Sequence, residues 1–190
     1  MAFSPDQPTV ATHRPPDSAV AMILVPIVAG AAVAVVLGVY GRLHEPTGIA
    51  INVAGFSGAQ AAKSWLTTLA FLFAGIQLVS ALMMWDKLPG APWVPTLHRW
   101  SGRIAVLLTV PVMVHCLYAL GFQSATPRVL IHSLLGCFFF GAFTAKMLLL
   151  TRRGLPNWVI PLIGGLVFSA LVGLWLTSSL WFFTTIGVTL

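Results

Sequence analysis

Long apolar stretches dominate the chain, and short polar segments separate them. An α-helix needs about twenty apolar residues to cross the hydrocarbon core of a bilayer. A helix also satisfies its own backbone hydrogen bonds, as a segment that crosses the membrane must. Five stretches reach this length, and they predict membrane helices at residues 20–41, 64–85, 101–122, 129–150 and 158–183. We therefore expect an all-α fold, an integral membrane bundle of five transmembrane helices.

The first nineteen residues differ from the rest of the chain. Residues 1–19 are rich in Pro, Ser, Thr and Asp and lack a hydrophobic pattern, which is typical of a disordered polar tail. A cleaved signal peptide needs a basic segment directly before a short apolar run. Here Arg14 stands between two acidic residues, and the apolar run that follows is long enough to span the membrane. We expect a retained first helix and one transmembrane domain over residues 20–190.

Composition and charge agree with a membrane protein. The chain is 58% hydrophobic and only 7% charged, whereas a soluble domain carries about 25% charged residues. The net charge of +6 is spread over the ends of the apolar stretches without forming a basic run, so we expect membrane lipid around the chain and no nucleic-acid partner. Seven Lys and Arg residues lie on the side of the N-terminus and three on the other side. The positive-inside rule then predicts a cytoplasmic N-terminus.

Small residues repeat along the first predicted helix. Gly30, Ala34 and Gly38 follow one another at intervals of four residues. Small side chains at this spacing let two helices approach closely in a membrane. The stripe predicts helix packing, either within one chain or between two copies in a homo-oligomer.

Two histidines lie inside the third and fourth predicted helices. An ionisable side chain at membrane depth is costly and usually marks a functional site. The linker at residues 123–128 is short, so we expect antiparallel neighbouring helices that place His115 and His132 within roughly 10 Å of the same membrane face. Imidazole ligates iron and other transition metals, so the pair predicts a metal or haem site. Alternatively, the two histidines form hydrogen bonds between helices and serve packing.

Neighbouring residues fit a bulky planar group beside these histidines. Gly136 lies one turn after His132 and leaves room on the same face. Pro111 lies one turn before His115 and is expected to kink the third helix. Arg128 stands at the outer end of the fourth helix, where a guanidinium pairs well with carboxylates such as haem propionates.

Two further histidines and two cysteines are weaker candidates. His98 lies seventeen residues before His115 and is turned about 100° from it around the helix, so we expect an interfacial hydrogen-bonding role and keep His98 as a reserve ligand. His44, just past the first helix, is a second reserve ligand. Cys116 and Cys137 point away from the histidine pair by helical angle, and we expect them to be small buried hydrophobes.

The sequence carries no independent catalytic constellation. All four acidic residues lie in the tail or in loops, outside the predicted helices. A phosphate-binding loop, a nucleophile motif and a dinucleotide fingerprint are all missing from the sequence. Whether the chain is an enzyme therefore stays open, and any redox chemistry has to come from a cofactor.

Residues 97–103 read Leu-His-Arg-Trp-Ser-Gly-Arg, and an apolar helix that carries His115 follows. This arrangement resembles the HRW-x-GR…H signature of ferric-reductase-like and cytochrome b561-like transmembrane domains, over residues 97–150. The resemblance implies a haem b with His115 and His132 as axial ligands and Arg128 as a propionate partner. The fourth helix departs from the pattern because it carries a single histidine, so the resemblance implies one haem.

The resulting expectation is a membrane-bound b-type cytochrome with its haem near the outer leaflet. Its electrons would be exchanged with an extracytoplasmic redox protein or with quinone. Similarity to small bacterial membrane proteins with the same core implies a multi-pass protein of the bacterial cell (inner) membrane. The alternative is a non-redox scaffold or transporter subunit, whose histidines pack between helices or bind a transition metal.

Overall fold

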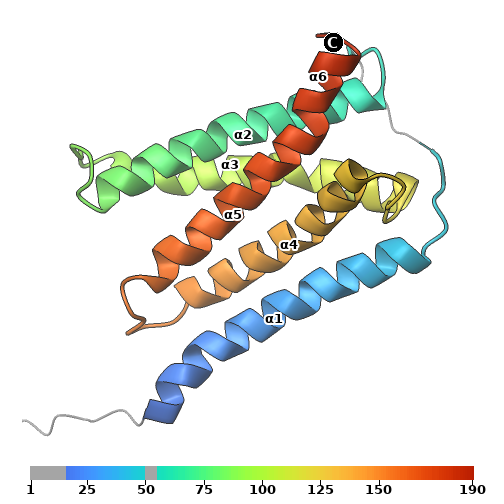
Figure 1. Cartoon of the computed structure of the whole chain (residues 1–190). Coiled ribbons are helices and arrows are strands. Elements are labelled where there is room, and N and C mark those ends of the chain that lie inside the picture. The colour runs from blue at the N-terminus through green and yellow to red at the C-terminus, as the bar shows by residue number, and fades with distance from the viewer. Residues whose placement is uncertain (1–15, 50–54) are drawn as a thin grey trace, which may run out of the picture.

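The computed structural model describes residues 16–49 and 55–190, which are helical throughout apart from their connecting loops. Figure 1 shows the arrangement of these helices. The elements are α1 (Pro16–Leu43), α2 (Ala59–Met84), α3 (Val94–His115), η1 (Cys116–Leu120), α4 (Pro127–Leu150), α5 (Val159–Trp175), η2 (Leu176–Leu180) and α6 (Trp181–Thr185). The segments η1 and η2 are single π-helical turns that continue α3 and α5 without a break.

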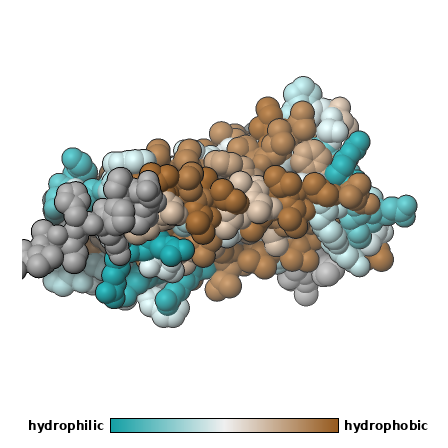
Figure 2. Space-filling view, turned by 90° about the horizontal axis from the view of Figure 1, so that it is seen from below, coloured by the Kyte–Doolittle hydropathy of each residue, from teal (hydrophilic) through white to brown (hydrophobic). Residues whose placement is uncertain are grey.

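The predicted all-α membrane bundle is confirmed. The described residues form five continuous helical segments that are long and apolar enough to cross a membrane. Figure 2 shows a largely apolar middle between two more polar ends on one face of the molecule. The helix boundaries differ from the predicted ones mainly at the starts of α1, α2 and α3, and α2 begins at Ala59 instead of residue 64. Residues 16–19 of the predicted tail belong to α1, while residues 1–15 lie outside the described residues. The third helix starts at Val94, with a proline in its first turn, so His98 lies inside a helix.

The helices pack in pairs that do not follow their order along the chain. In the described structure, α1 packs along α4, α2 packs along α3, and α5 contacts both α4 and α2 (Figure 1). The expectation that α3 and α4 pack against each other as antiparallel neighbours is therefore wrong. They are joined by a short loop, but their principal contacts are with α2 and α1.

Small residues explain why α4 pairs with α1. A Cβ atom added to Gly141 would lie 2.6 Å from the carbonyl oxygen of Gly30 and 2.8 Å from Cβ of Ala34. Such a close approach is open only to glycine and alanine faces. The predicted small-residue stripe therefore packs within the chain, and this contact draws α4 away from α3.

Two apolar clusters hold α4 against its other neighbours. Ala142, Ala145 and Leu149 pack on Val159 and Ile163 of α5. Closer to the middle of the bundle, a second cluster joins α2, α4 and α5, and its members are Ala74, Phe139, Ala170 and Leu171. Phe139 is only 2% exposed, so this cluster fills the interior of the bundle where α2, α4 and α5 meet.

Candidate functional site

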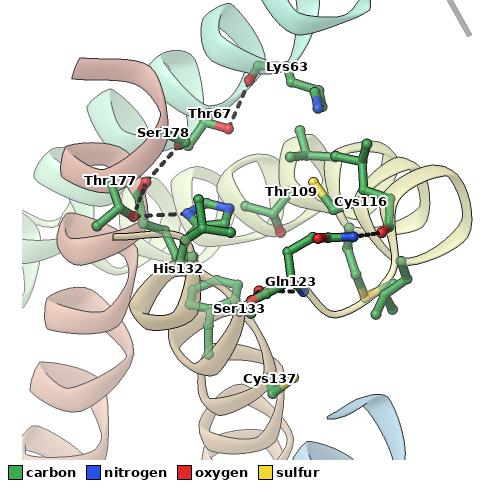
Figure 3. A pocket seen from close by; sticks show the side chains of 18 of the residues that line it. Lys63, Thr67, Thr109, Cys116, Gln123, His132, Ser133, Cys137, Thr177 and Ser178 are labelled. Atoms are coloured by element: carbon green, nitrogen blue, oxygen red, sulfur yellow. Dashed lines mark hydrogen bonds between the residues drawn. The ribbon is translucent and has the colours of Figure 1, made fainter. Parts of the chain in front are cut away.

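A cavity of about 320 Å³ opens between α2, α3, α4 and α5. It lies at the end of the bundle that carries the α3–α4 loop, which we call the cavity end (Figure 3). Pockets of about 300–1,000 Å³ are typical of small-molecule sites. The space exists because α3 and α4 are held apart by their separate partners. Its walls are mostly apolar, with a few polar side chains that converge on the interior.

The cavity wall follows helical periodicity on each contributing element. From α3 and η1 come Thr109, Val112, Met113, Cys116 and Leu117, a set with the three- and four-residue spacing of one helix face. Facing them on α4 are Arg128, Val129, His132, Ser133, Gly136, Cys137, Phe139 and Phe140. The remaining wall comes from α2, with Lys63 and Thr67, and from α5 with η2 and α6. Leu37 of α1 and the loop residues Gly121, Phe122 and Gln123 complete it.

Both π-helical turns lie at this cavity. Cys116 and Leu117 of η1 and Thr177 and Ser178 of η2 line it from two sides. Single π turns inside α-helices occur frequently at functional sites, because the wider turn changes the direction of the side chains beside it. Their coincidence at one cavity is independent support for a functional site there.

His132 is held in one orientation by a hydrogen bond to η2. Its Nδ1 lies 2.9 Å from Oγ1 of Thr177 (Figure 3). When the Thr177 hydroxyl donates its single proton to the carbonyl oxygen of Gly173, 2.7 Å away, its oxygen accepts the proton of His132 Nδ1–H. The other ring nitrogen, Nε2, is then unprotonated and free to bind a metal or accept a hydrogen bond.

Two cationic side chains give the cavity a positive character. The Arg128 guanidinium donates from Nη1 to the carbonyl oxygen of Thr177 at 2.6 Å and lies 3.9 Å from the ring centroid of Trp181. Lys63 lines the α2 side and is half-buried. No acidic side chain of the described residues lines the cavity. An anionic group of a ligand would therefore be stabilised here.

Only part of the predicted site comes together. His132, Arg128 and Gly136 share the cavity, and a Cβ atom at Gly136 would meet nothing closer than Leu174 at 4.0 Å. His115 is not among the residues that line the cavity. It precedes Cys116 and is turned about 100° from it around the helix, off the face that lines the cavity.

The two reserve histidines have other environments. His44 stacks between the rings of Tyr40 and Tyr118, at centroid distances of 5.0 Å and 4.9 Å, and its Nε2 lies 3.2 Å from the Tyr118 carbonyl oxygen. It fastens the end of α1 to η1. His98 lies near the opposite end of α3 and packs on α2, where its Nδ1 is 2.9 Å from Oγ of Ser80. Neither histidine lines the cavity.

Several cavity residues were not among the predicted site residues. Thr177 and Lys63 were missed, although a run of three hydroxyl residues at 177–179 in an apolar helix was a usable signal. Cys116 and Cys137, expected to be small hydrophobes, are free thiols that line the same cavity as His132. Within the described part of the chain, no three His, Cys, Asp or Glu residues gather closely enough to hold a metal ion by themselves.

Comparison with known proteins yields one match. A protein-family model described as a family of unknown function (DUF6529) matches residues 22–190. No curated protein and no solved structure match the chain. The matched range contains every residue of the cavity wall.

Proposed function

The chain belongs to DUF6529, a family of unknown function, and we propose that it binds haem b in the cavity, where His132 would hold the iron. The observation that carries the proposal is the state of the His132 ring. Its Nδ1 lies 2.9 Å from Oγ1 of Thr177, which leaves Nε2 as the ring nitrogen for a ligand in a residue that lines a mostly apolar cavity. Haem-ligating histidines are commonly oriented by such a hydrogen bond to the second nitrogen.

The residues of the cavity match the chemistry of this cofactor. Haem b combines an apolar ring with acidic propionates, and the cavity combines apolar walls with Lys63 and Arg128. A Cβ atom at Gly136, one turn from His132, would contact only Leu174, at 4.0 Å, and the cavity lies between α3 and α4, which do not pack along each other. Bound haem would supply one-electron exchange.

The residue that would hold the iron from α3 differs from the one that the family resemblance implies. His115 does not line the cavity, whereas Met113 and Cys116 of the facing wall do. A methionine thioether and a cysteine thiolate both ligate haem iron in known cytochromes and oxygenases. We therefore assign His132 as the ligand from α4 and leave the α3 position to one of these sulfur side chains.

The physiological role that follows is membrane electron transfer at the cavity end. The distribution of Lys and Arg predicts that this end faces away from the cytoplasm. A haem there would exchange electrons with an extracytoplasmic redox protein or with quinone, in a bacterial inner membrane.

Reduced-minus-oxidised absorption spectra of the purified protein test the proposal. We expect Soret and α bands in the wild type and in His115→Ala, and their loss in His132→Ala. His115→Ala is a matched control because the residue lies at a similar depth but outside the cavity. Absence of bands from the wild type would exclude the haem, and their loss in both variants would restore the bis-histidine arrangement.

A second candidate is a non-redox role, in which the cavity takes an anionic amphiphile without iron, as a scaffold or transporter subunit would. The observation that favours it is that His132 is already bonded across the interface between α4 and η2, as a packing histidine would be. Metal analysis of the same sample separates the cases. Iron in the sample would support haem. Zinc or copper without iron would support a metal site. A sample without any of these metals would support the scaffold role.

A further inference from the structure

A charged side chain lies inside α4 far from the cavity. Lys146 is half-buried in the apolar second half of α4, about one turn before its last residue, Leu150. No described membrane helix contains an acidic residue within its span, and no hydrogen bond or ion pair to the Lys146 ammonium occurs among the described residues. A lone ammonium at membrane depth is costly and usually has a function.

Helical geometry shows which way Lys146 faces. It follows Arg128 of the cavity wall by eighteen residues, which is about five turns, so the two side chains share one face of α4. On α3, His98 precedes Cys116 of the cavity wall by the same interval. Lys146 and His98 therefore face the same space between the helix pairs, at the end of the bundle opposite the cavity.

The two groups lie on helices that do not pack along each other, so Lys146 and His98 bound the space between these helices from opposite sides. The charge of Lys146 acts electrostatically on the His98 ring across this space. The described residues contain no fully enclosed side-chain nitrogen that lacks a partner, so the Lys146 ammonium stays accessible from outside.

His98 is fixed in the same manner as His132. Its Nδ1 lies 2.9 Å from Oγ of Ser80, and the Ser80 hydroxyl donates its proton to the Ile76 carbonyl oxygen at 2.7 Å. In that arrangement the serine oxygen accepts from His98 Nδ1–H, and Nε2 is the acceptor nitrogen of the ring. The Gln77 amide donates to the His98 carbonyl oxygen and to Ser101, which holds this turn of α3 against α2.

We infer that Lys146 and His98 form a binding site for the headgroup of an anionic phospholipid that carries a hydroxyl, such as phosphatidylglycerol. The Lys146 ammonium pairs with the phosphate, and Nε2 of His98 accepts a hydrogen bond from the headgroup hydroxyl. The phosphate supplies the counter-charge that the helices themselves lack. Basic loop residues at the same end add attraction for an anionic headgroup, and they are Lys87, Arg152 and Arg153. This inference does not depend on the identity of the cavity ligand.

Native mass spectrometry of the full chain in neutral detergent tests the site. The lipids are phosphatidylglycerol, phosphatidylethanol, which has the charge without the hydroxyl, and phosphatidylcholine, which lacks both features. We expect phosphatidylglycerol to bind best, and Lys146→Met to weaken it about fivefold to tenfold. Lys146→Arg should retain binding, which shows that the charge matters and that the fold is intact. His98→Phe should remove the preference for phosphatidylglycerol over phosphatidylethanol.

A lysine control locates the effect. Lys63→Met changes the cation of the cavity at the other end of the bundle and should not alter phosphatidylglycerol binding by more than about twofold. Equal binding by wild type and Lys146→Met would overturn the inference, and so would a loss in Lys63→Met alone, which would place the lipid in the cavity. Displacement of the lipid by millimolar inorganic phosphate would overturn the lipid assignment in favour of a free phosphate site.

Discussion

His132 of α4 and Thr177 of η2 are joined by a hydrogen bond of 2.9 Å between Nδ1 and Oγ1. The bond crosses the interface between two helices and determines which ring nitrogen of His132 is left for a ligand. The Thr177 carbonyl oxygen accepts from Arg128 as well, so one residue of a π turn positions both the imidazole and the guanidinium of the cavity. The predictions below follow from this arrangement and from the packing around it.

Replacing Thr177 by valine should weaken haem binding while preserving the fold. Valine has the shape of threonine but cannot accept the Nδ1 proton, so the ring loses its fixed orientation and tautomer. Loss of such a supporting hydrogen bond typically lowers affinity by about 10- to 100-fold. Haem titration into the purified apoprotein, followed at the Soret band, measures the effect. Thr184→Val, whose hydroxyl bonds only within its own helix, is the control, and equal loss in both variants would contradict the role of Thr177.

Replacing Gly136 by leucine should block the cavity without unfolding the bundle. A Cβ at this position would contact only Leu174, at 4.0 Å, so the larger side chain extends into the volume beside His132. We expect the variant to purify with an unchanged far-ultraviolet circular dichroism spectrum and without a bound cavity ligand. Gly164→Leu, in α5 with nothing within 4 Å of its Cβ position, should keep the ligand. Retention of ligand by Gly136→Leu would show that the ligand lies elsewhere.

Replacing Gly141 by alanine should destabilise the contact between α1 and α4. The added Cβ would lie 2.6 Å from a backbone oxygen of α1, so the helices have to separate, at a cost of about 1–3 kcal/mol. Unfolding in mixed micelles with increasing sodium dodecyl sulfate gives the change in free energy. Gly165→Ala has open space around its Cβ position and should be neutral or slightly stabilising. If the two variants unfold alike, the close approach of α1 and α4 is not a stabilising contact.

The two free cysteines should report on occupancy of the cavity. Cys116 and Cys137 lie on opposite walls, so a small membrane-permeant maleimide should label both in the empty protein. A bound ligand should slow the labelling of both thiols together, because it occupies the space that they share. Mass spectrometry of Cys116→Ala and Cys137→Ala separates the two rates. Protection of neither thiol on addition of haem would argue against haem in this cavity.

The pattern of apolar residues along the chain was enough to predict the membrane helices. The length of the apolar stretches predicted all five membrane-spanning helices, because a segment in a bilayer has to satisfy its backbone hydrogen bonds internally. The spacing of Gly30, Ala34 and Gly38 also indicated a packing face before any partner was known. His132 and Gly136 were placed correctly relative to each other, since they are one turn apart on the same helix and depend on no other element.

The tertiary structure decided which histidine meets the cavity. Helical periodicity gives the angle between two residues of one helix, but not which helix lies opposite them. The close contact of Gly30 with Gly141 pairs α4 with α1, and α3 packs on α2. His115 therefore lies outside the cavity that His132 lines. Thr177 belongs to the π-helical turn η2. A π turn changes the side-chain directions, so regular 3.6-residue periodicity does not predict that Thr177 faces the cavity. The sequence alone determined the membrane helices and the presence of a costly histidine in α4, whereas long-range packing determined what that histidine faces.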